Sequence, residues 1–133
     1  MERDGYDATR IHLSNMANTP SEVVEAEYPI EVLRYAIRDG SGGKGKHQGG
    51  KGLVREYKVL SDHVTLTTIF ERGVIPPYGL FGGEDGAPFK VTLQRGAERI
   101  PLSGCQNLPV GSGDIVLVET AGGGGFGSLP RMV

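Results

Sequence analysis

The passage from glycine-rich to alternating sequence between Ser41 and Leu60 is the feature that most constrains this chain. Residues 41–52 are SGGKGKHQGGKG, and residues 53–60 are LVREYKVL. Glycine weakens helix and strand interiors and favours turns, whereas apolar residues that alternate with polar ones predict a strand. A long helix cannot cross this region, so we expect a protein of short strands joined by turns.

The same segment partly matches the phosphate-binding pattern G-x-x-x-x-G-K-[ST]. Gly45, Gly50 and Lys51 fit the pattern, but Gly52 stands where a hydroxyl residue should ligate magnesium. A strand is predicted after it, so no helix N-terminus would meet a phosphate. The dinucleotide pattern G-x-G-x-x-G fails at Gln48. We therefore interpret the segment as a solvated turn between strands, with nucleotide binding as the alternative.

The composition agrees with one β-rich domain. Among the 133 residues are 22 glycines and 8 prolines, which suits short strands joined by many turns. Alternating segments predict strands at residues 30–38, 53–60, 63–70, 89–94, 99–103 and 115–119. The predicted fold class is mainly β: a sandwich or partly open barrel of about six or more short strands, with one short helix in the N-terminal half.

We divide the chain into three parts. Residues 1–18 form an N-terminal arm that is expected to continue from a missing upstream region, residues 19–120 form the β-rich domain, and residues 121–133 form a glycine-rich tail. The tail has too few side chains to pack by itself, so we expect it to lie against another surface or to be mobile. The proline-containing segment 71–88 is expected to be a long ordered loop.

Two local structures are predicted within the β-rich domain. Thr19 is expected to cap the helix and Glu22 to complete a capping box around Pro20, at the first helical position. Pro29 limits this helix to about two turns, because the residue before a proline leaves the helical region. The strands on either side of Ser61-Asp62 are expected to pair as a hairpin.

Charge and cysteine content limit which partners and which cellular compartment we expect for this protein. The formal net charge of −2 gives no electrostatic reason to expect nucleic acid or an anionic membrane as a partner. The single cysteine, Cys105, excludes an internal disulfide and fits a reducing compartment, so we expect a cytoplasmic protein. The sequence around Cys105 matches no protease signature, and the residue is expected to be half-buried.

Metal-binding spacings are absent from the sequence. His12, His47 and His63 are scattered, and one cysteine cannot form a zinc site. We therefore expect no metal and no cofactor to be bound by this chain alone.

Two arginines are the best candidates for binding a substrate. Arg55 lies in one apolar strand and Arg72 follows another, where a cation usually needs a partner or a ligand. Each could hold a carboxylate or phosphate with two hydrogen bonds, and the loop with Tyr78 is expected nearby. The alternative is an ion pair with a glutamate of the same region: Glu56, Glu71 or Glu84.

Six stretches of the chain together resemble one family. In order, they are NTPSEVVE with the following YP, SGGKG, GGKGLVREY, PYGLFGGE, PVGSGD and the final GGGGFG. This order resembles the C-terminal part of the hydantoinase B/5-oxoprolinase family over nearly the whole chain. The family usually has arginine where Gln48 stands, and its members are much longer. The chain therefore looks like a terminal fragment, a separately encoded piece or an expressed domain.

The resemblance implies a function in ATP-dependent opening of a cyclic amide, either a hydantoin or 5-oxoproline; related members carboxylate ketones such as acetone. It also implies two partners: the upstream region of the same subunit, which carries the metal-binding residues, and a hydantoinase A-type subunit that handles ATP. ATP and a divalent metal then belong to the full complex, which we expect to be an oligomer. No catalytic residue of the family transfers to a numbered position here, so the chain alone is expected to be an inactive part of a hydrolase.

In this interpretation the paired glycines belong to interface backbone, where the lack of a side chain permits close approach. The pairs are Gly42 and Gly43, Gly49 and Gly50, and Gly82 and Gly83. The alternative, from a different functional class, is a stand-alone, non-catalytic β-rich module for binding or assembly.

Overall fold

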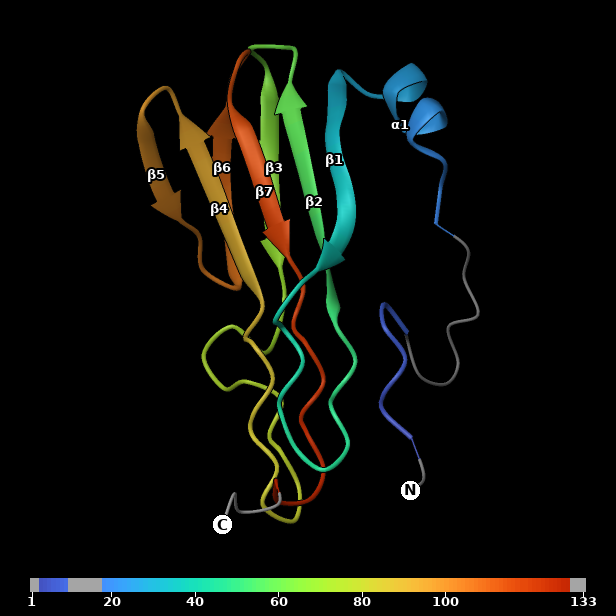
Figure 1. Cartoon of the computed structure of the whole chain (residues 1–133). Coiled ribbons are helices and arrows are strands. Elements are labelled where there is room, and N and C mark those ends of the chain that lie inside the picture. Colours follow the sequence, from blue (N-terminus) through green and yellow to red (C-terminus); the bar gives the residue numbers. More distant parts are fainter. Residues whose placement is uncertain (1–2, 10–17, 130–133) are drawn as a thin grey trace.

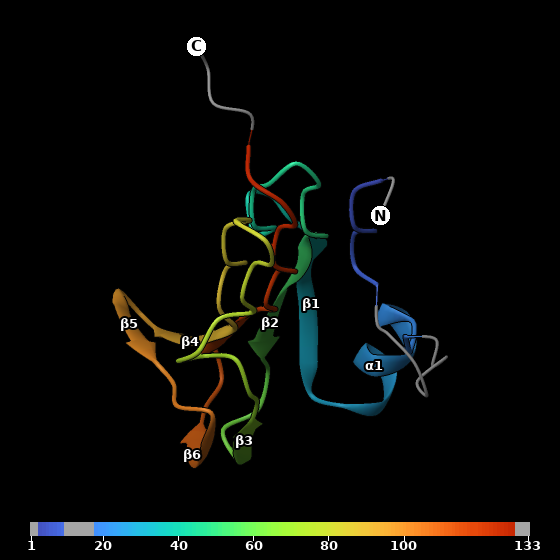
Figure 2. The same cartoon turned by 90° about the horizontal axis from the view of Figure 1, so that it is seen from below.

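Two antiparallel sheets make up most of the structure, a computed structural model that describes residues 3–9 and 18–129. Helix α1 (Ser21–Glu27) precedes strands β1 (Ile30–Arg38), β2 (Gly52–Val59), β3 (Val64–Ile69), β4 (Lys90–Arg95), β5 (Glu98–Pro101), β6 (Cys105–Val110) and β7 (Ile115–Glu119). One sheet has the order β1-β2-β7-β4-β5, and the other consists of β3 and β6. Figures 1 and 2 show β3 and β6 stacked on one face of the larger sheet. The predicted mainly-β fold is confirmed as an open sandwich.

The core lies between the two sheets. Val116 of β7 pairs with Tyr57 of β2 on one side and with Leu93 of β4 on the other, so these three side chains share the inner face. Leu93 is fully buried at 0% exposure. The buried core cluster comprises Val59, Val91, Leu93, Leu102, Val110 and Val116. Burial of this apolar surface is the main favourable contribution to folding.

The predicted hairpin around Ser61-Asp62 is wrong. β2 pairs with β1 and β7, whereas β3 pairs with β6, so this connection carries the chain from one sheet to the other. The physical reason is burial: Val59 is 2% exposed, and Val64 packs against the same core from the facing sheet. Alternation shows which side chains share a face, but it does not select the strand that will be the partner.

Strand β6 was not predicted. Pro109, which lacks a ladder N–H, lies within it and masks the pattern. The strand tolerates proline because it belongs to a two-stranded sheet, where each strand has a free edge. Cys105 begins this strand and is exposed, which corrects the expectation of a half-buried residue.

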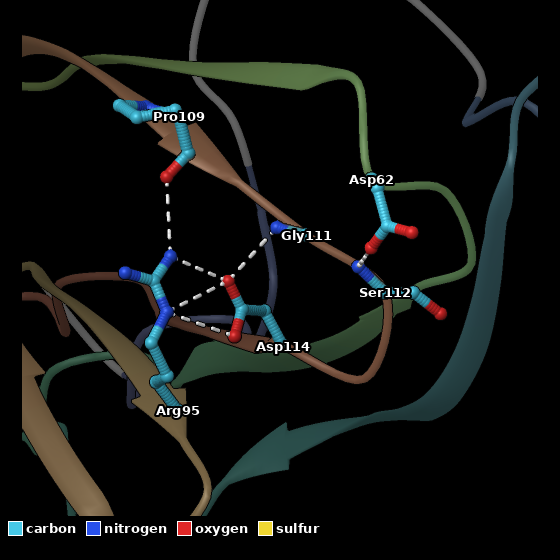
Figure 3. Close-up of polar contacts among 6 residues, drawn as sticks. All are labelled: Asp62, Arg95, Pro109, Gly111, Ser112 and Asp114. Carbon is cyan, nitrogen blue, oxygen red and sulfur yellow. Dashed lines mark hydrogen bonds and ion pairs between the residues drawn. The ribbon is translucent and has the colours of Figure 1, made fainter.

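Asp62 and Asp114 hold the turn between β6 and β7, where the chain passes from one sheet to the other (Figure 3). Asp114 accepts hydrogen bonds from Arg95 Nη2 at 2.7 Å and from the Gly111 backbone N–H at 3.0 Å. Arg95 also donates to the Pro109 carbonyl oxygen at 3.1 Å. Asp62 accepts a bond of 3.0 Å from the Ser112 N–H. These contacts tie the end of β4 to the start of β7.

The start of α1 differs from the prediction. Pro20 occupies the N-cap position, with φ −55° and ψ 144°, and no side chain caps the helix. Thr19 therefore lies one residue outside the position in which its hydroxyl could reach the first N–H groups. Glu25 accepts a hydrogen bond of 2.7 Å from the Val32 N–H, which links α1 to β1.

Candidate functional site

Three loops below the sandwich form a second region, which we call the glycine lobe (Figure 1). It comprises residues 41–51, 77–87 and 121–128, and each loop bonds to the other two through backbone groups. Gly43 N–H donates to the Gly123 carbonyl at 2.8 Å, and Glu84 N–H donates to the Lys44 carbonyl at 2.7 Å. Gly125 N–H donates to the Glu84 carbonyl at 2.8 Å. Residues 121–128 of the glycine-rich tail therefore lie against loops of the same chain.

The predicted loop glycines all lie in this lobe. A Cβ atom at Gly42, Gly43, Gly49, Gly50 or Gly83 would overlap backbone atoms of a neighbouring segment. At Gly82, φ is +89°, a conformation that residues with a side chain rarely adopt. The backbone at Gly43 and Gly49 is buried, while the side chains of Lys44 and Lys46 are exposed. The interpretation as a solvated turn is therefore correct for these lysines and wrong for the glycine backbone.

The amide groups that would hold a phosphate are already bonded. Gln48 N–H donates to Asp4 Oδ1 at 2.8 Å, and Lys51 N–H donates to Asp7 Oδ1 at 2.8 Å. The Lys51 ammonium lies 2.7 Å from Asp39 Oδ1, which raises the pKa of Lys51 and lowers that of Asp39. The predicted strand is present and begins at Gly52, one residue before the expected start, so no helix starts there. Two carboxylates at these positions oppose binding of a further anion.

A cavity of about 1000 Å³ lies over β1 and β2, lined also by α1, the N-terminal arm and the base of the tail. Arg55 of β2 pairs with Tyr35 of β1 and with Val118 of β7, so all three side chains are on the inner face of the sheet. The cavity is the part of this face beside β1. Figure 2 shows α1 and residues 3–9 of the arm next to β1, apart from β3 and β6.

Arg55 is held in this cavity by neutral groups. Its Nη2 donates to Asn18 Oδ1 at 2.7 Å and to the Tyr35 hydroxyl at 3.4 Å. Asn18 Nδ2 donates to the same hydroxyl at 2.6 Å, and the guanidinium carbon lies 4.7 Å from the centroid of the Tyr35 ring. Stacking on an aromatic face stabilises a cation and fixes its plane. The ion pair of Arg55 with a glutamate, the alternative prediction, is absent from the described residues.

The electrostatic setting favours the charged form of Arg55. Partial burial of the guanidinium acts to lower the pKa of Arg55. The side chains of Tyr57 and Tyr35 outweigh this effect, so the pKa lies above its usual value. Arg55 is therefore a permanent cation in the cavity at physiological pH.

The other two predicted site residues lie elsewhere. Arg72 has φ +62° and lines a second cavity, of about 710 Å³, beside β4 and the stacked rings of Phe70 and Phe89. Tyr78 is 64% exposed in the glycine lobe and lines neither cavity. The structure does not bring Arg55 and Arg72 into one cavity, and their assignment to substrate binding stays a prediction.

Asn18 and Tyr35 are the residues that the sequence prediction missed. Tyr35 could have been found by aligning the alternating strands 30–38 and 53–60 as neighbours, which places Tyr35 beside Arg55. Asn18 had no such signal, because it precedes the helix and reaches Arg55 across 37 residues of sequence.

Clustered metal ligands and membrane-spanning helices are both missing from the described part of the chain. Within residues 3–9 and 18–129, no three histidine, cysteine or acidic side chains gather in a way that could hold a metal ion. His12 lies outside the described residues. No helix in these two ranges is long and apolar enough to span a bilayer.

Several known proteins resemble this chain. It is 48% identical to a protein of Methanocaldococcus jannaschii whose name states no function. The match extends over 111 residues, which are 84% of this chain and 20% of that protein. It is 38% identical to 5-oxoprolinase 1 of Arabidopsis thaliana, over 94% of this chain and 10% of that protein. It is 31% identical to a protein of a Pseudomonas species that is named as the B-type component of a D-/L-hydantoinase, with coverage of 95% and 22%.

The fold also occurs in a solved structure, nucleotide-free acetone carboxylase. The TM-score is 0.77 at 23% identity, over 94% of this chain and 21% of the other. The chain thus spans between 10% and 22% of the length of these relatives. The family model described as hydantoinase B/oxoprolinase matches residues 1–129. The chain therefore belongs to the hydantoinase B/oxoprolinase family.

Proposed function

We propose that this chain is the C-terminal β-rich domain of a hydantoinase B/5-oxoprolinase-type subunit, in which it contributes to ATP-dependent hydrolysis of a hydantoin or 5-oxoproline. The observation that carries this proposal is the family match over residues 1–129, combined with coverage of only 10% to 22% of relatives named as a 5-oxoprolinase or as a hydantoinase component. Its partners are then the rest of the subunit and a hydantoinase A-type subunit, in the cytoplasm.

The chemistry of the described residues supports a scaffold role. The cavity over β2 offers the Arg55 guanidinium and neutral hydroxyl groups, and its other described cation, Lys51, is paired with Asp39 at 2.7 Å. Among the described residues, Arg55 has no acidic partner with which it could exchange a proton. No described cluster could hold a metal ion. ATP and a divalent metal would therefore be bound by other parts of the complex.

The exposed apolar surface supports burial within a larger assembly. Val74 and Ile75, which line the same cavity as Arg72, are 95% and 70% exposed, and Ile69 at the end of β3 is 83% exposed. Apolar patches of this kind usually mark a surface that another protein segment covers. We infer that the rest of the subunit packs there.

Activity measurements on separate and combined parts test the proposal. The 133-residue chain is expected to show no ATP hydrolysis and no opening of 5-oxoproline or hydantoin above a buffer blank. The whole subunit, combined with its hydantoinase A-type partner, is expected to be active, and deletion of this region should abolish ring opening. Turnover by the chain alone would refute the scaffold role, and full activity after the deletion would refute any contribution.

A stand-alone binding or assembly module is the second candidate. It is favoured by the tail, whose backbone bonds to loops of its own chain, as Gly125 does to Glu84. A stand-alone module should be monodisperse and bind little hydrophobic dye, whereas a domain of a larger subunit should bind dye through its exposed apolar residues and self-associate. Light scattering with dye fluorescence separates the two.

A further inference from the structure

Arg55 is a cation without a described counter-charge. Among residues 3–9 and 18–129, no carboxylate lies within ion-pair distance of its guanidinium, although Arg38, Lys51, Lys58 and Arg95 each have one. The described hydrogen bonds of Arg55 to Asn18 and Tyr35 both use Nη2 and end on neutral oxygens. The Tyr57 hydroxyl, which raises the pKa of Arg55, is a third neutral partner. A guanidinium carries five N–H donors, so donors remain for a ligand.

The surroundings of Arg55 favour a ligand with one negative charge. Lys51 also lines the cavity, but its ammonium is neutralised by Asp39 at 2.7 Å. Asp7, the nearby acidic residue of the arm, accepts from the Lys51 backbone N–H at 2.8 Å. One guanidinium remains to balance a charge, which matches a monocarboxylate better than a phosphate dianion.

The remaining walls suit a small organic body attached to that charge. Leu53, Tyr57, Phe89 and Val118 supply apolar and aromatic surface in the same cavity. A volume of about 1000 Å³ admits a small ligand. Mostly apolar walls with a few fixed polar groups are the usual composition of a small-molecule site.

We propose that the cavity over β2 binds a small organic monocarboxylate, whose carboxylate pairs with the Arg55 guanidinium. Asn18 and Tyr35 are positioning residues: they hold the Nη2 side of the guanidinium and its plane, and leave the other N–H groups for the ligand. This assignment goes beyond the proposed function and rests on it only for the choice of probe.

The probe is 5-oxoproline, a ring amide that carries one carboxylate, and its control is 2-pyrrolidinone, the same ring without the carboxylate. Binding is measured on the 133-residue chain by NMR, from the Nε–Hε signal of Arg55. We expect a saturable shift with 5-oxoproline and none with 2-pyrrolidinone at equal concentration. No saturable shift with 5-oxoproline, or an equal shift with the neutral ring, would overturn the proposal.

Substitutions separate a carboxylate site from a general effect of charge. Arg55→Gln should weaken binding of 5-oxoproline by at least about tenfold, the size expected for loss of a charge-assisted pair. Arg34→Gln is the matched control. Arg34 lies in the neighbouring strand β1, directly opposite Glu56 in the register, and its side chain is on the other face of the sheet. Arg34→Gln should leave the affinity unchanged. Equal weakening by both variants would show a nonspecific electrostatic effect and reject the site.

Tyr35→Phe tests the positioning role and keeps the ring on which Arg55 stacks. The variant should bind 5-oxoproline more weakly than the wild type but more tightly than Arg55→Gln, with the chemical shift of the Arg55 Nε–Hε signal moved in the free protein. An unmoved signal with unchanged affinity would show that the hydroxyl does not orient the guanidinium. Absence of binding in a chain whose assembled enzyme is active would reject this site and leave the proposed function standing.

Discussion

The sandwich and the glycine lobe are held together in opposite ways. In the sandwich, side chains such as Leu93 and Val116 fill the space between two sheets that lie apart. In the lobe, backbones touch directly, because residues such as Gly43 and Gly83 have no side chain to separate them. The first region depends on apolar area removed from water, and the second on hydrogen bonds and close contact between main chains.

Arg38 links the two regions. Its Nη1 donates to the carbonyl oxygens of Pro88 and Thr120, at 2.7 and 2.8 Å, where the chain enters β4 and leaves β7. Its Nε lies 3.4 Å from Glu119 Oε1, and the Arg38 side chain is 11% exposed. The cation thus satisfies carbonyl groups at the junction of the sandwich and the lobe. This contact keeps the base of the lobe in register with the end of the sheet.

The largest expected effect is on the sandwich. Leu93→Ala should lower the free energy of unfolding by about 2–5 kcal/mol, because a fully buried leucine leaves a cavity between the sheets. Chemical denaturation monitored by circular dichroism measures this change. Ile69→Ala in β3, where the side chain is 83% exposed, is the control and should cost much less. Similar losses in both variants would mean that the core does not dominate stability.

A smaller, local effect is expected in the lobe. The Cβ atom introduced by Gly49→Ala would overlap the Gly123 carbonyl, so the loops must move apart. Hydrogen exchange should become faster at amides in residues 41–51 and 121–128, while amides of β4 and β7 stay protected.

Gly123→Ala is the matched control for this lobe variant. At Gly123 the nearest atom to a new Cβ is 3.2 Å away, so a small adjustment is enough. We expect its exchange to remain close to that of the wild type. If both variants open the sandwich as well as the lobe, the two regions are one cooperative unit, and the contrast between them fails.

The smallest effect concerns the turn that Asp114 and Arg95 hold. The hydrogen bond from Arg95, with that from Gly111, keeps the pKa of Asp114 below its ordinary value in the folded protein. The stability from this carboxylate is therefore present above the unfolded pKa, near 3.8, and is lost as the pH falls through the lower folded pKa. Asp114→Asn should cost about 1 kcal/mol at pH 7.

The pH dependence distinguishes this electrostatic role from simple packing. As the pH falls below about 4, the difference in stability between wild type and Asp114→Asn should shrink, because the wild-type carboxylate becomes protonated. Denaturation at several pH values between neutral and acidic conditions measures it. A difference that stays constant over this range would show that the charge of Asp114 contributes nothing.

The strands were predictable in part because their chemistry is local. Alternation located β1, β2, β3, β4, β5 and β7 and gave the mainly-β class. Partners were not predictable, since β2 joins β7 across more than fifty residues, as the register Tyr57↔Val116 shows, and not its neighbour β3. Pro109 hid β6 for a chemical reason, because its missing N–H matters little at a free edge.

In the candidate site and the lobe, too, local features were predictable and contacts between distant segments were not. Arg55 was predicted because a cation in an apolar strand is unusual, but its contact with Asn18 depends on how the arm packs. Glycine content showed that backbones could approach closely, yet only the fold shows that Gly43 meets Glu84 and Gly125. Contacts between distant segments were therefore outside the reach of local patterns.

The lobe has a consequence for the interpretation of genetic variants. Where a main-chain atom of another loop occupies the space of a Cβ, as at Gly49 or Gly122, every amino acid other than glycine is excluded, whatever its chemistry. A deep mutational survey would rank such sites among the most sensitive in the protein, beside any residue that touches a reacting molecule. Sensitivity of that kind would report geometry alone, and a loss of function at these positions would carry no information about the reaction.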